Sequence, residues 1–293
     1  MVVTGVSSGI GRATALRLAA AGYHVYGGVR RLAGAPATAW VTPLLLDVTD
    51  EAQIAAAAKT VAGDVGDIGL AGLVDNAGIG VTGPLELTPP AEIRRQFEVN
   101  VVGQVAVTQA FLPLLRAARG RVVLVGSIGD RITIPFGGPL AASKHALASI
   151  ADALRLELAP WGVRVVLLEP ASINTDAVGK LERDARAAAA GFAADPGYRG
   201  TYLEMVRRLA VLERRGSPPG VVADAVAAAL ATRRPRARYL VGKDARRLAA
   251  LGRLPAPVLD AVRRRMFGLP APGTLALVAG PRATGGSPRP PHQ

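Results

Sequence analysis

Apolar runs alternate with stretches of helical periodicity from the start of the chain to about position 240. Short Val/Leu-rich runs separated by helical segments are typical of repeated βαβ units. The runs are apolar almost throughout, which indicates strands covered by helices on both faces. We therefore predict an α/β fold built on a doubly wound parallel sheet of about seven strands. The predicted strands are Met1–Thr4, Tyr23–Val29, Val41–Leu46, Leu70–Val74, Arg121–Val125, Val163–Leu168 and Arg238–Val241.

The alternation of strands and helices, with the segments that follow it, predicts one domain over residues 1–267. Residues 175–216 form a long, helix-prone insertion between the last two strands, and at the carboxyl ends of the strands it would cover a ligand crevice as a lid. Residues 244–267 indicate two short helices, and residues 268–293, rich in Pro, Gly, Ala and Arg, are predicted to be disordered. Helices are predicted to start near Gly9, Thr49, Pro90, Gln96, Leu140 and Pro219.

Composition limits the chemistry that the chain can support. Half of the 293 residues are apolar, enough for a large core, and there is no cysteine for a disulfide or a thiolate metal site. Three scattered histidines argue against a zinc site, so no metal is expected. We see no run of the roughly 20 apolar residues that span a bilayer. The first strand begins at once and leaves no room for a signal peptide, so we expect a cytoplasmic protein.

The net charge of +13 is concentrated at the C-terminal end. Residues 233–293 hold thirteen Lys/Arg and two acids, so the preceding body is nearly neutral. No recognition motif or interleaved aromatic residues accompany this charge, so we expect no nucleic-acid partner. Apolar residues recur at helical spacing over residues 258–266 beside Arg263–Arg265. This basic helix either makes a weak peripheral contact with an anionic membrane or packs on the lid with its arginines in water, and the second reading is preferred.

A glycine-rich turn follows the first strand and opens a helix. Backbone N–H groups of such a turn approach a pyrophosphate at the positive end of the helix. Glycines also punctuate ordinary loops, so the turn by itself is weak evidence. The residues expected to hold a dinucleotide are Gly5, Ser7, Ser8, Gly9, Ile10 and Gly11.

The spacing TGxxxGIG resembles the short-chain dehydrogenase/reductase family, and further motifs follow in the family's order over about residues 1–180. This resemblance implies a Rossmann-type fold, with Asp47 and Val48 contacting adenine. It also implies a cofactor-binding Asn76-Ala77-Gly78 segment and a second one at Pro170–Thr175, where Pro170, Ile173 and Thr175 match the family and Ala171 replaces its usual glycine.

The end of the second strand indicates which dinucleotide is bound. Sites that prefer NAD place an acid there for the ribose hydroxyls, and a carboxylate would repel a 2′-phosphate. Here the strand ends Arg30-Arg31, no acid occurs between Gly22 and Leu46, and Arg12 follows the turn. Arginine suits a phosphate because it stays charged and donates a planar fork. We predict NADP(H), the alternative being a merely solvated basic strand end.

One residue of the resembling family's catalytic set is missing from this sequence. In the resembling family a serine holds the substrate oxygen, a tyrosine passes the proton, a lysine lowers the phenol pKa and binds ribose, and an asparagine holds a relay water. By position these catalytic roles fall on Ser127, Lys144 and Asn100, whereas Leu140 stands in the place of the tyrosine. Because residues four apart share a helix face, Leu140 and Lys144 would both point at the nicotinamide.

Three outcomes stay open for such a site: a slow or unusual reductase, a chemistry that needs no phenol, or a nucleotide-binding protein without turnover. No residue replaces the phenol on sequence grounds. His145 should point away from the site, and Tyr198 and Tyr202 are interpreted as packing residues of the lid. Asp130 and Arg131 are interpreted as residues of the loop surface, although Asp130 is near enough in sequence to approach a substrate.

The predicted substrate is a small apolar alcohol or ketone, because apolar residues surround the expected mouth. Ile134, Phe136 and Leu140 form the predicted substrate pocket, with further wall or core residues from the lid. The long lid and the stretch 238–246 resemble the subgroup that includes 17β-hydroxysteroid dehydrogenases. The helices around Gln96–Arg116 and Leu140–Pro160 commonly pair subunits in the resembling family, so a homodimer or homotetramer is expected. The lid residues are Val178, Leu181, Phe192, Met205 and Val206.

Overall fold

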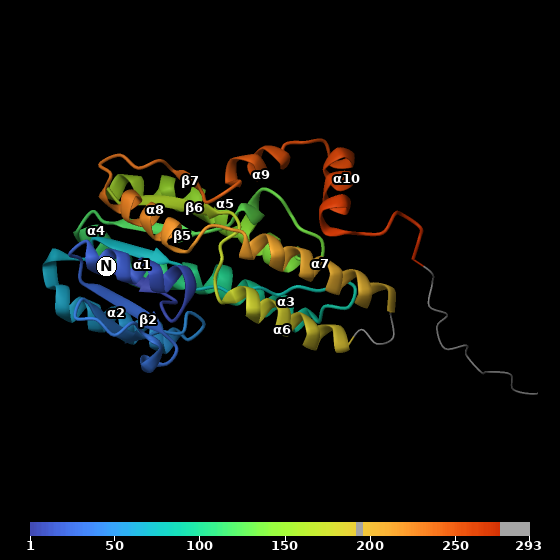
Figure 1. Cartoon of the computed structure of the whole chain (residues 1–293). Helices are drawn as coiled ribbons and strands as arrows, with labels where there is room; N and C mark the ends of the chain where they lie inside the picture. Colours follow the sequence, from blue (N-terminus) through green and yellow to red (C-terminus); the bar gives the residue numbers. More distant parts are fainter. Residues whose placement is uncertain (192–195, 276–293) are drawn as a thin grey trace, which may run out of the picture.

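Seven parallel strands form a single sheet in the computed structural model, which describes residues 1–191 and 196–275 (Figure 1). The strand order is β3-β2-β1-β4-β5-β6-β7, so the direction of winding reverses between β1 and β4. The prediction of a doubly wound α/β sheet is thus confirmed. The strands are β1 Val2–Thr4, β2 Val25–Val29, β3 Val41–Leu45, β4 Gly72–Asp75, β5 Arg121–Val125, β6 Arg164–Pro170 and β7 Arg238–Val241.

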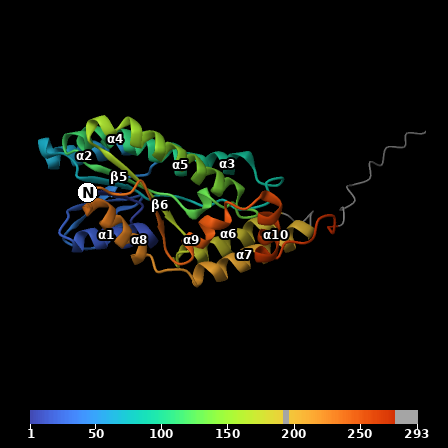
Figure 2. The same ribbon diagram turned by 90° about the horizontal axis from the view of Figure 1, so that it is seen from above.

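Helices cover both faces of the sheet (Figure 2). Helices α1 (Gly9–Ala20) and α8 (Gly220–Ala231) pack together on one face. Helices α2 (Glu51–Val65), α4 (Gly103–Ala117) and α5 (Gly138–Glu157) cover the other. Short 3-10 turns complete the connections: Leu32–Gly34, Gly66–Ile68, Ile128–Asp130 and Ala159–Trp161.

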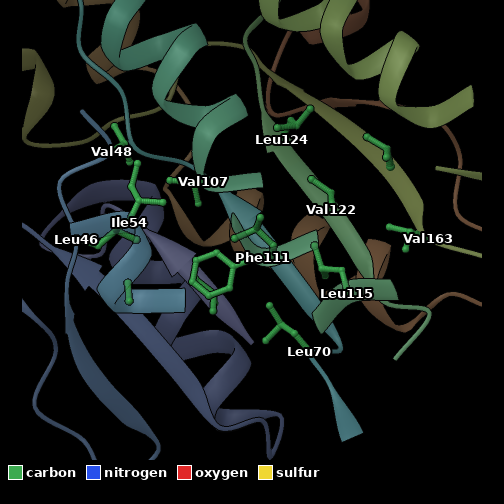
Figure 3. Close-up of a cluster of buried hydrophobic side chains, with 14 of the residues drawn as sticks. Leu46, Val48, Ile54, Leu70, Val107, Phe111, Leu115, Val122, Leu124 and Val163 are labelled. Atoms are coloured by element: carbon green, nitrogen blue, oxygen red, sulfur yellow. The ribbon is translucent and has the colours of Figure 1, made fainter. Parts of the chain in front are cut away.

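Each face of the sheet has its own apolar core. The cluster beneath α2, α4 and α5 centres on Phe111, which is fully buried beside Leu70 and Leu115 (Figure 3). The opposite cluster joins β1 residues such as Val3 to Leu18 of α1 and Val226 of α8. Burial on both sides explains why the central strands β1, β4, β5 and β6 are rich in Val and Leu, whereas the edge strands β3 and β7 are partly exposed.

Helix α3 (Pro90–Phe97) continues without a break into α4 through a π-helical turn at Glu98–Val102. The two helix starts predicted at Pro90 and Gln96 therefore belong to one long helix. The π turn adds a residue to the repeat and disturbs the apolar periodicity that the prediction used. This helix, Pro90–Ala117, is long and apolar enough to cross a membrane by length and composition, whereas the sequence analysis expected no such segment. In this structure its apolar face packs on the sheet.

The predicted lid consists of α6 (Ala177–Ala190) and α7 (Pro196–Arg214), which lie beyond the carboxyl ends of the strands with α9 (Ala245–Leu251) and α10 (Ala256–Phe267) (Figure 1). A third apolar cluster joins Tyr202, Met205 and Val206 of α7 to Phe267 of α10. The basic helix thus packs its apolar side on the lid. Phe192 and the tail residues 276–293 lie outside the described residues.

Candidate functional site

The glycine-rich turn lies at the carboxyl end of β1, next to the point where the winding of the sheet reverses. Such a crevice is where open α/β sheets bind ligands. Gly5 has φ +70° and Gly9 has φ +53°, a region that side-chain-bearing residues rarely adopt. The first turn of α1 carries no acid, and its capping residue Ser8 makes no side-chain capping bond. Its N–H groups are therefore available to an anion.

Gly11 is fixed by close packing rather than by an unusual φ. A Cβ added there would lie 2.2 Å from the carbonyl oxygen of Gly5 and 2.5 Å from Asn76 Nδ2. The Asn76 amide donates to the carbonyl oxygens of Thr4 (3.0 Å) and Gly5 (3.3 Å). The Thr4 hydroxyl accepts from the backbone N–H groups of Asn76 and Ala77, each at 2.9 Å. These bonds join the turn after β1 to the Asn76-Ala77-Gly78 segment after β4.

Three arginines lie in the segments that follow β1 and β2, where the adenosine end of a dinucleotide is expected. Arg12, Arg30 and Arg31 are all exposed, and none of them pairs with a carboxylate within residues 1–191 and 196–275. After β3, Val48 is buried and Asp47 accepts hydrogen bonds from the Thr49 N–H and hydroxyl. The crevice therefore offers unpartnered positive charge, and the fit to a phosphorylated dinucleotide is good.

The segment after β6 closes the opposite side of the crevice. Thr175 approaches the glycine turn, and its Cγ2 would lie 3.4 Å from a Cβ added at Gly9. Glu213 of the lid accepts a hydrogen bond from the Ile173 N–H at 3.1 Å, and burial raises the pKa of this carboxyl. The sequence analysis did not identify Glu213, because nothing in the sequence indicates that an acid of the lid contacts the backbone of Ile173.

A cavity of about 430 Å³ lies beside this crevice, between the sheet and the lid. Its lining includes Ser127, Lys144, Leu140 and Ile134, together with Ala171, Ser172, Ile173 and Thr175. Val178 and Leu181 line the lid side, whereas Met205 and Val206 pack inside the lid cluster. The structure thus brings the predicted serine, lysine and leucine to one cavity, and most of its other lining groups are apolar.

Phe136 lies outside the lining of this cavity, although the sequence placed it in the substrate pocket. It has φ +58° and packs edge-on against Tyr198 and Tyr202 of α7, facing a neighbouring hollow. The Tyr202 hydroxyl lies 2.8 Å from Thr82 Oγ1. Both lid tyrosines therefore serve lid packing, as predicted.

Asn100 lies in the π turn and is completely buried. Its Oδ1 accepts from the Ile79 N–H at 2.9 Å, and its Nδ2 donates to the Ile79 carbonyl at 3.0 Å and to Ser143 Oγ at 3.2 Å. Ser143 in turn donates to the carbonyl of Leu140 at 2.7 Å. Asn100 thus braces the start of α5, and its side chain does not reach the cavity lining.

Lys144 is buried at the cavity floor, where its ammonium donates to the Val125 carbonyl at 2.9 Å. Burial lowers the pKa of Lys144 to about 8, and the charge of Asp130 partly opposes that shift. Ser127 Oγ accepts from the Gly129 N–H at 3.0 Å and keeps its own proton to donate. The cavity lining therefore includes the Ser127 hydroxyl and a Lys144 ammonium that titrates close to neutrality.

The turn after Ser127 carries a buried ionic cluster that the sequence had assigned to the loop surface. Arg131 forms a two-pronged ion pair with Glu169 at 2.8 and 2.9 Å, and Arg238 bonds Glu169 at 3.2 Å. Asp130 is 8 % exposed, with Arg238 at 3.6 Å. The surface assignment of Asp130 is wrong because the turn packs on α5. The feature of the sequence that could have indicated this cluster is Glu169, an acid near the end of the largely apolar strand β6.

Taken together, the fold and the crevice define a dinucleotide-binding α/β enzyme. Residues 1–186 match the family model described as short chain dehydrogenase, and the chain belongs to that family. It is 36% identical over 272 residues to an NADPH-dependent 3-dehydrocapnine reductase of Ornithobacterium rhinotracheale, covering 89% of this chain and 94% of the relative. It is 37% identical over 287 residues to mouse retinol dehydrogenase 5, covering 92% and 89%.

A solved structure shares the architecture. A short chain dehydrogenase from Burkholderia cenocepacia J2315 in complex with NADP superposes with a TM-score of 0.68 at 26% identity, covering 89% of this chain and 95% of that one. The chain is thus a short-chain oxidoreductase by family, with a seven-stranded Rossmann-type sheet.

Proposed function

We propose that the chain is an NADP(H)-dependent oxidoreductase that interconverts an apolar alcohol and the corresponding ketone. The observation that carries this proposal is the junction of two sites. The glycine turn at residues 5–11 follows β1 at the switch point of the sheet, and Thr175, which lines the cavity of Ser127 and Lys144, lies beside Gly9 of that turn.

The preference for NADP(H) rests on charge. Arg30 and its neighbours Arg12 and Arg31 offer guanidinium groups to a 2′-phosphate, and no acid stands at the end of β2 to repel it. An NADPH-dependent relative and an NADP-bound structural neighbour support the same choice. When bound, the reduced nicotinamide supplies the hydride of the reaction.

The residues of the chain orient the substrate oxygen and exclude water. Ser127 donates a hydrogen bond to that oxygen, and the Lys144 ammonium lies beside it in the same lining. Ile134, Leu140 and the lid residues Val178 and Leu181 give the cavity an apolar wall. This wall suits a hydrophobic substrate, in keeping with relatives named for retinol and dehydrocapnine.

A coupled binding and turnover experiment tests this function. We expect NADPH to raise the melting temperature of the protein more than NADH does. We also expect loss of NADPH absorbance with at least some members of a panel of linear and cyclic apolar ketones. Binding without turnover across the panel would favour a non-catalytic nucleotide-binding protein, and absence of binding would remove the proposal.

A further inference from the structure

A hollow of about 610 Å³ lies next to the cavity of about 430 Å³ that Ser127 and Lys144 line. Ile134 lines both spaces, so the loop that carries it is a wall that the two spaces share. Phe136 of this loop lines the hollow and not the cavity, whereas Ile132 lines the cavity and not the hollow. The hollow is therefore a neighbour of the proposed substrate site.

Helix α10 forms a second shared wall. Met266 and Phe267 line the cavity, whereas Arg263 and Arg264 line the hollow. The same loop and the same helix thus border both spaces. A chain molecule that extends from the cavity past Ile134 would reach the two arginines.

The backbone of Phe136 is strained at this wall. Its φ of +58° lies in the left-handed region, which bulky side chains rarely adopt. The Phe136 carbonyl accepts from the Gly83 N–H at 2.8 Å, and its ring packs edge-on against Tyr198 and Tyr202. These contacts keep the ring in the lining of the hollow. Strain of this kind is concentrated at ligand-binding sites, where the surrounding structure holds an unfavourable conformation for a purpose.

The charge of the hollow is positive on balance. Its charged lining residues are Arg263, Arg264 and Asp260. Asp260 accepts from Arg263 at 3.2 Å, and its own side chain is 52% exposed. Arg264 is partly buried and pairs with no carboxylate in the described part of the chain. One guanidinium at this wall is therefore left without a compensating charge.

The rest of the lining is largely apolar. A guanidinium binds a carboxylate or a similar anion through a planar fork of N–H groups. Apolar walls with a few convergent polar groups are typical of sites for organic ligands. The hollow therefore suits a molecule that is apolar along its length and anionic at one end. Its apolar lining residues include Ile134, Pro135, Phe136, Leu269, Pro270 and Leu275.

We propose that the hollow is the outer part of the substrate site and that Arg264 binds an anionic end group of a long apolar substrate. The proposal rests on the proposed reductase function and names its substrate class, a keto or hydroxy amphiphile with a carboxylate or another anionic end. The carbonyl carbon lies in the cavity with Ser127, and the chain passes Ile134. Arg263, which Asp260 partly neutralises, adds a second positive charge at the outer end.

Keto acids and their methyl esters, matched in chain length, test the role of the end group. For the wild type we expect a higher kcat/KM for the acid than for the ester. Among acids, kcat/KM should pass through a maximum as the carbonyl and the carboxylate are moved apart, because only some lengths reach from the cavity to Arg264. The esters should show no such maximum.

Substitutions of Arg264 separate charge recognition from fold stability. Arg264→Ala should lower kcat/KM for the best acid at least about fivefold, mainly through KM, and leave the ester within about twofold. Arg264→Glu should make the acid a poorer substrate than the ester. Equal losses for acid and ester in Arg264→Ala would assign Arg264 a structural role and overturn the proposal.

Arg265→Ala is the matched control. Arg265 follows Arg264 on the same helix, is exposed and lines neither space. Its substitution removes the same charge from the protein, so it measures the general attraction of a basic surface for anions. We expect its preference for the acid to equal that of the wild type. An equal loss of preference in Arg264→Ala and Arg265→Ala, or no preference in the wild type, would contradict a specific site.

A binding measurement distinguishes failure of this proposal from failure of the proposed function. In calorimetric titrations with NADP⁺ present, decanoate should bind the wild type and Arg265→Ala more tightly than decanol does. Arg264→Ala should lose this difference. Equal binding of decanoate and decanol to the wild type would overturn the anionic subsite even if ketones are reduced. If decanoate binding depends on Arg264 but no ketone consumes NADPH, the subsite stands and the reductase function fails.

Discussion

Leu140 and Lys144 lie one turn apart on α5, and both side chains line the cavity between the sheet and the lid. The lysine is buried and its ammonium donates to the Val125 carbonyl, and the leucine presents only carbon to the cavity. This position of the cavity lining therefore carries no phenol, and a substitution at Leu140 tests what a phenol would do there.

Restoring a phenol should accelerate the enzyme. We expect Leu140→Tyr to raise kcat for ketone reduction by about 100-fold or more, because positioned acid catalysis typically contributes about 10²–10⁴-fold. Leu140→Phe supplies the same ring without the hydroxyl and should not raise kcat. Steady-state kinetics with NADPH measure both, and equal rates for the two variants would show that the hydroxyl has no catalytic use here.

The choice of coenzyme should depend on Arg30. A hydrogen-bonded charge contributes about 1.5–3 kcal/mol, so Arg30→Ala should weaken NADPH binding by about 10-fold or more. NADH, which lacks the 2′-phosphate, should be affected far less. Calorimetric titration with each coenzyme measures the difference. Arg95→Ala, which removes an exposed arginine paired with Glu92 on α3, is the control and should change neither affinity. Equal losses for both coenzymes would contradict a 2′-phosphate contact.

The close packing at Gly11 should make even a methyl group costly. Gly11→Ala places a Cβ against backbone and against the Asn76 amide, and we expect about 1–3 kcal/mol of lost stability together with impaired NADPH binding. Gly63→Ala is the matched control in α2, where an added Cβ meets nothing within 4 Å. That change should stabilise the protein by about 1 kcal/mol. Urea unfolding measures both, and similar effects from the two substitutions would refute the packing argument.

Asp75 should give the protein a pH-dependent stability. It is fully buried at the end of β4, accepts from the Thr108 hydroxyl at 2.8 Å, and burial raises its pKa to about 7. A folded-state pKa above the unfolded value near 3.8 means that the folded protein binds the proton more tightly. The contribution is present below the unfolded pKa and is lost as the pH rises from about 4 to 7.

The size of the Asp75 contribution to stability follows from the shift of its pKa. Three pK units correspond to about 4 kcal/mol as an upper figure. Asp75→Asn copies the shape and the hydrogen bonding of the protonated acid, so its stability should vary less between pH 4 and 7. Urea unfolding at several pH values gives the comparison. A wild-type profile as flat as that of the variant would contradict a protonated Asp75.

The sequence by itself determined the architecture and predicted most of the residues that the structure brings to the crevice and the cavity. The central strands β1, β2, β4, β5 and β6 are buried on both faces, so most of the apolar runs that form the sheet are visible without any tertiary information. The glycine turn at residues 5–11 and the pair Leu140 and Lys144 can be recognised in the sequence, because each pattern lies within one turn or one helix.

Only the tertiary structure decided which charges meet beside the turn that begins at Ser127. Asp130, Glu169 and Arg238 come from the turn after β5, from β6 and from β7, and no spacing along the chain predicts that they share one buried cluster. The lid likewise brings Glu213 to Ile173 across 40 residues and directs Phe136 away from the cavity. Such contacts depend on how separate elements pack, and packing brings together residues whose separation in sequence carries no information about their distance in space.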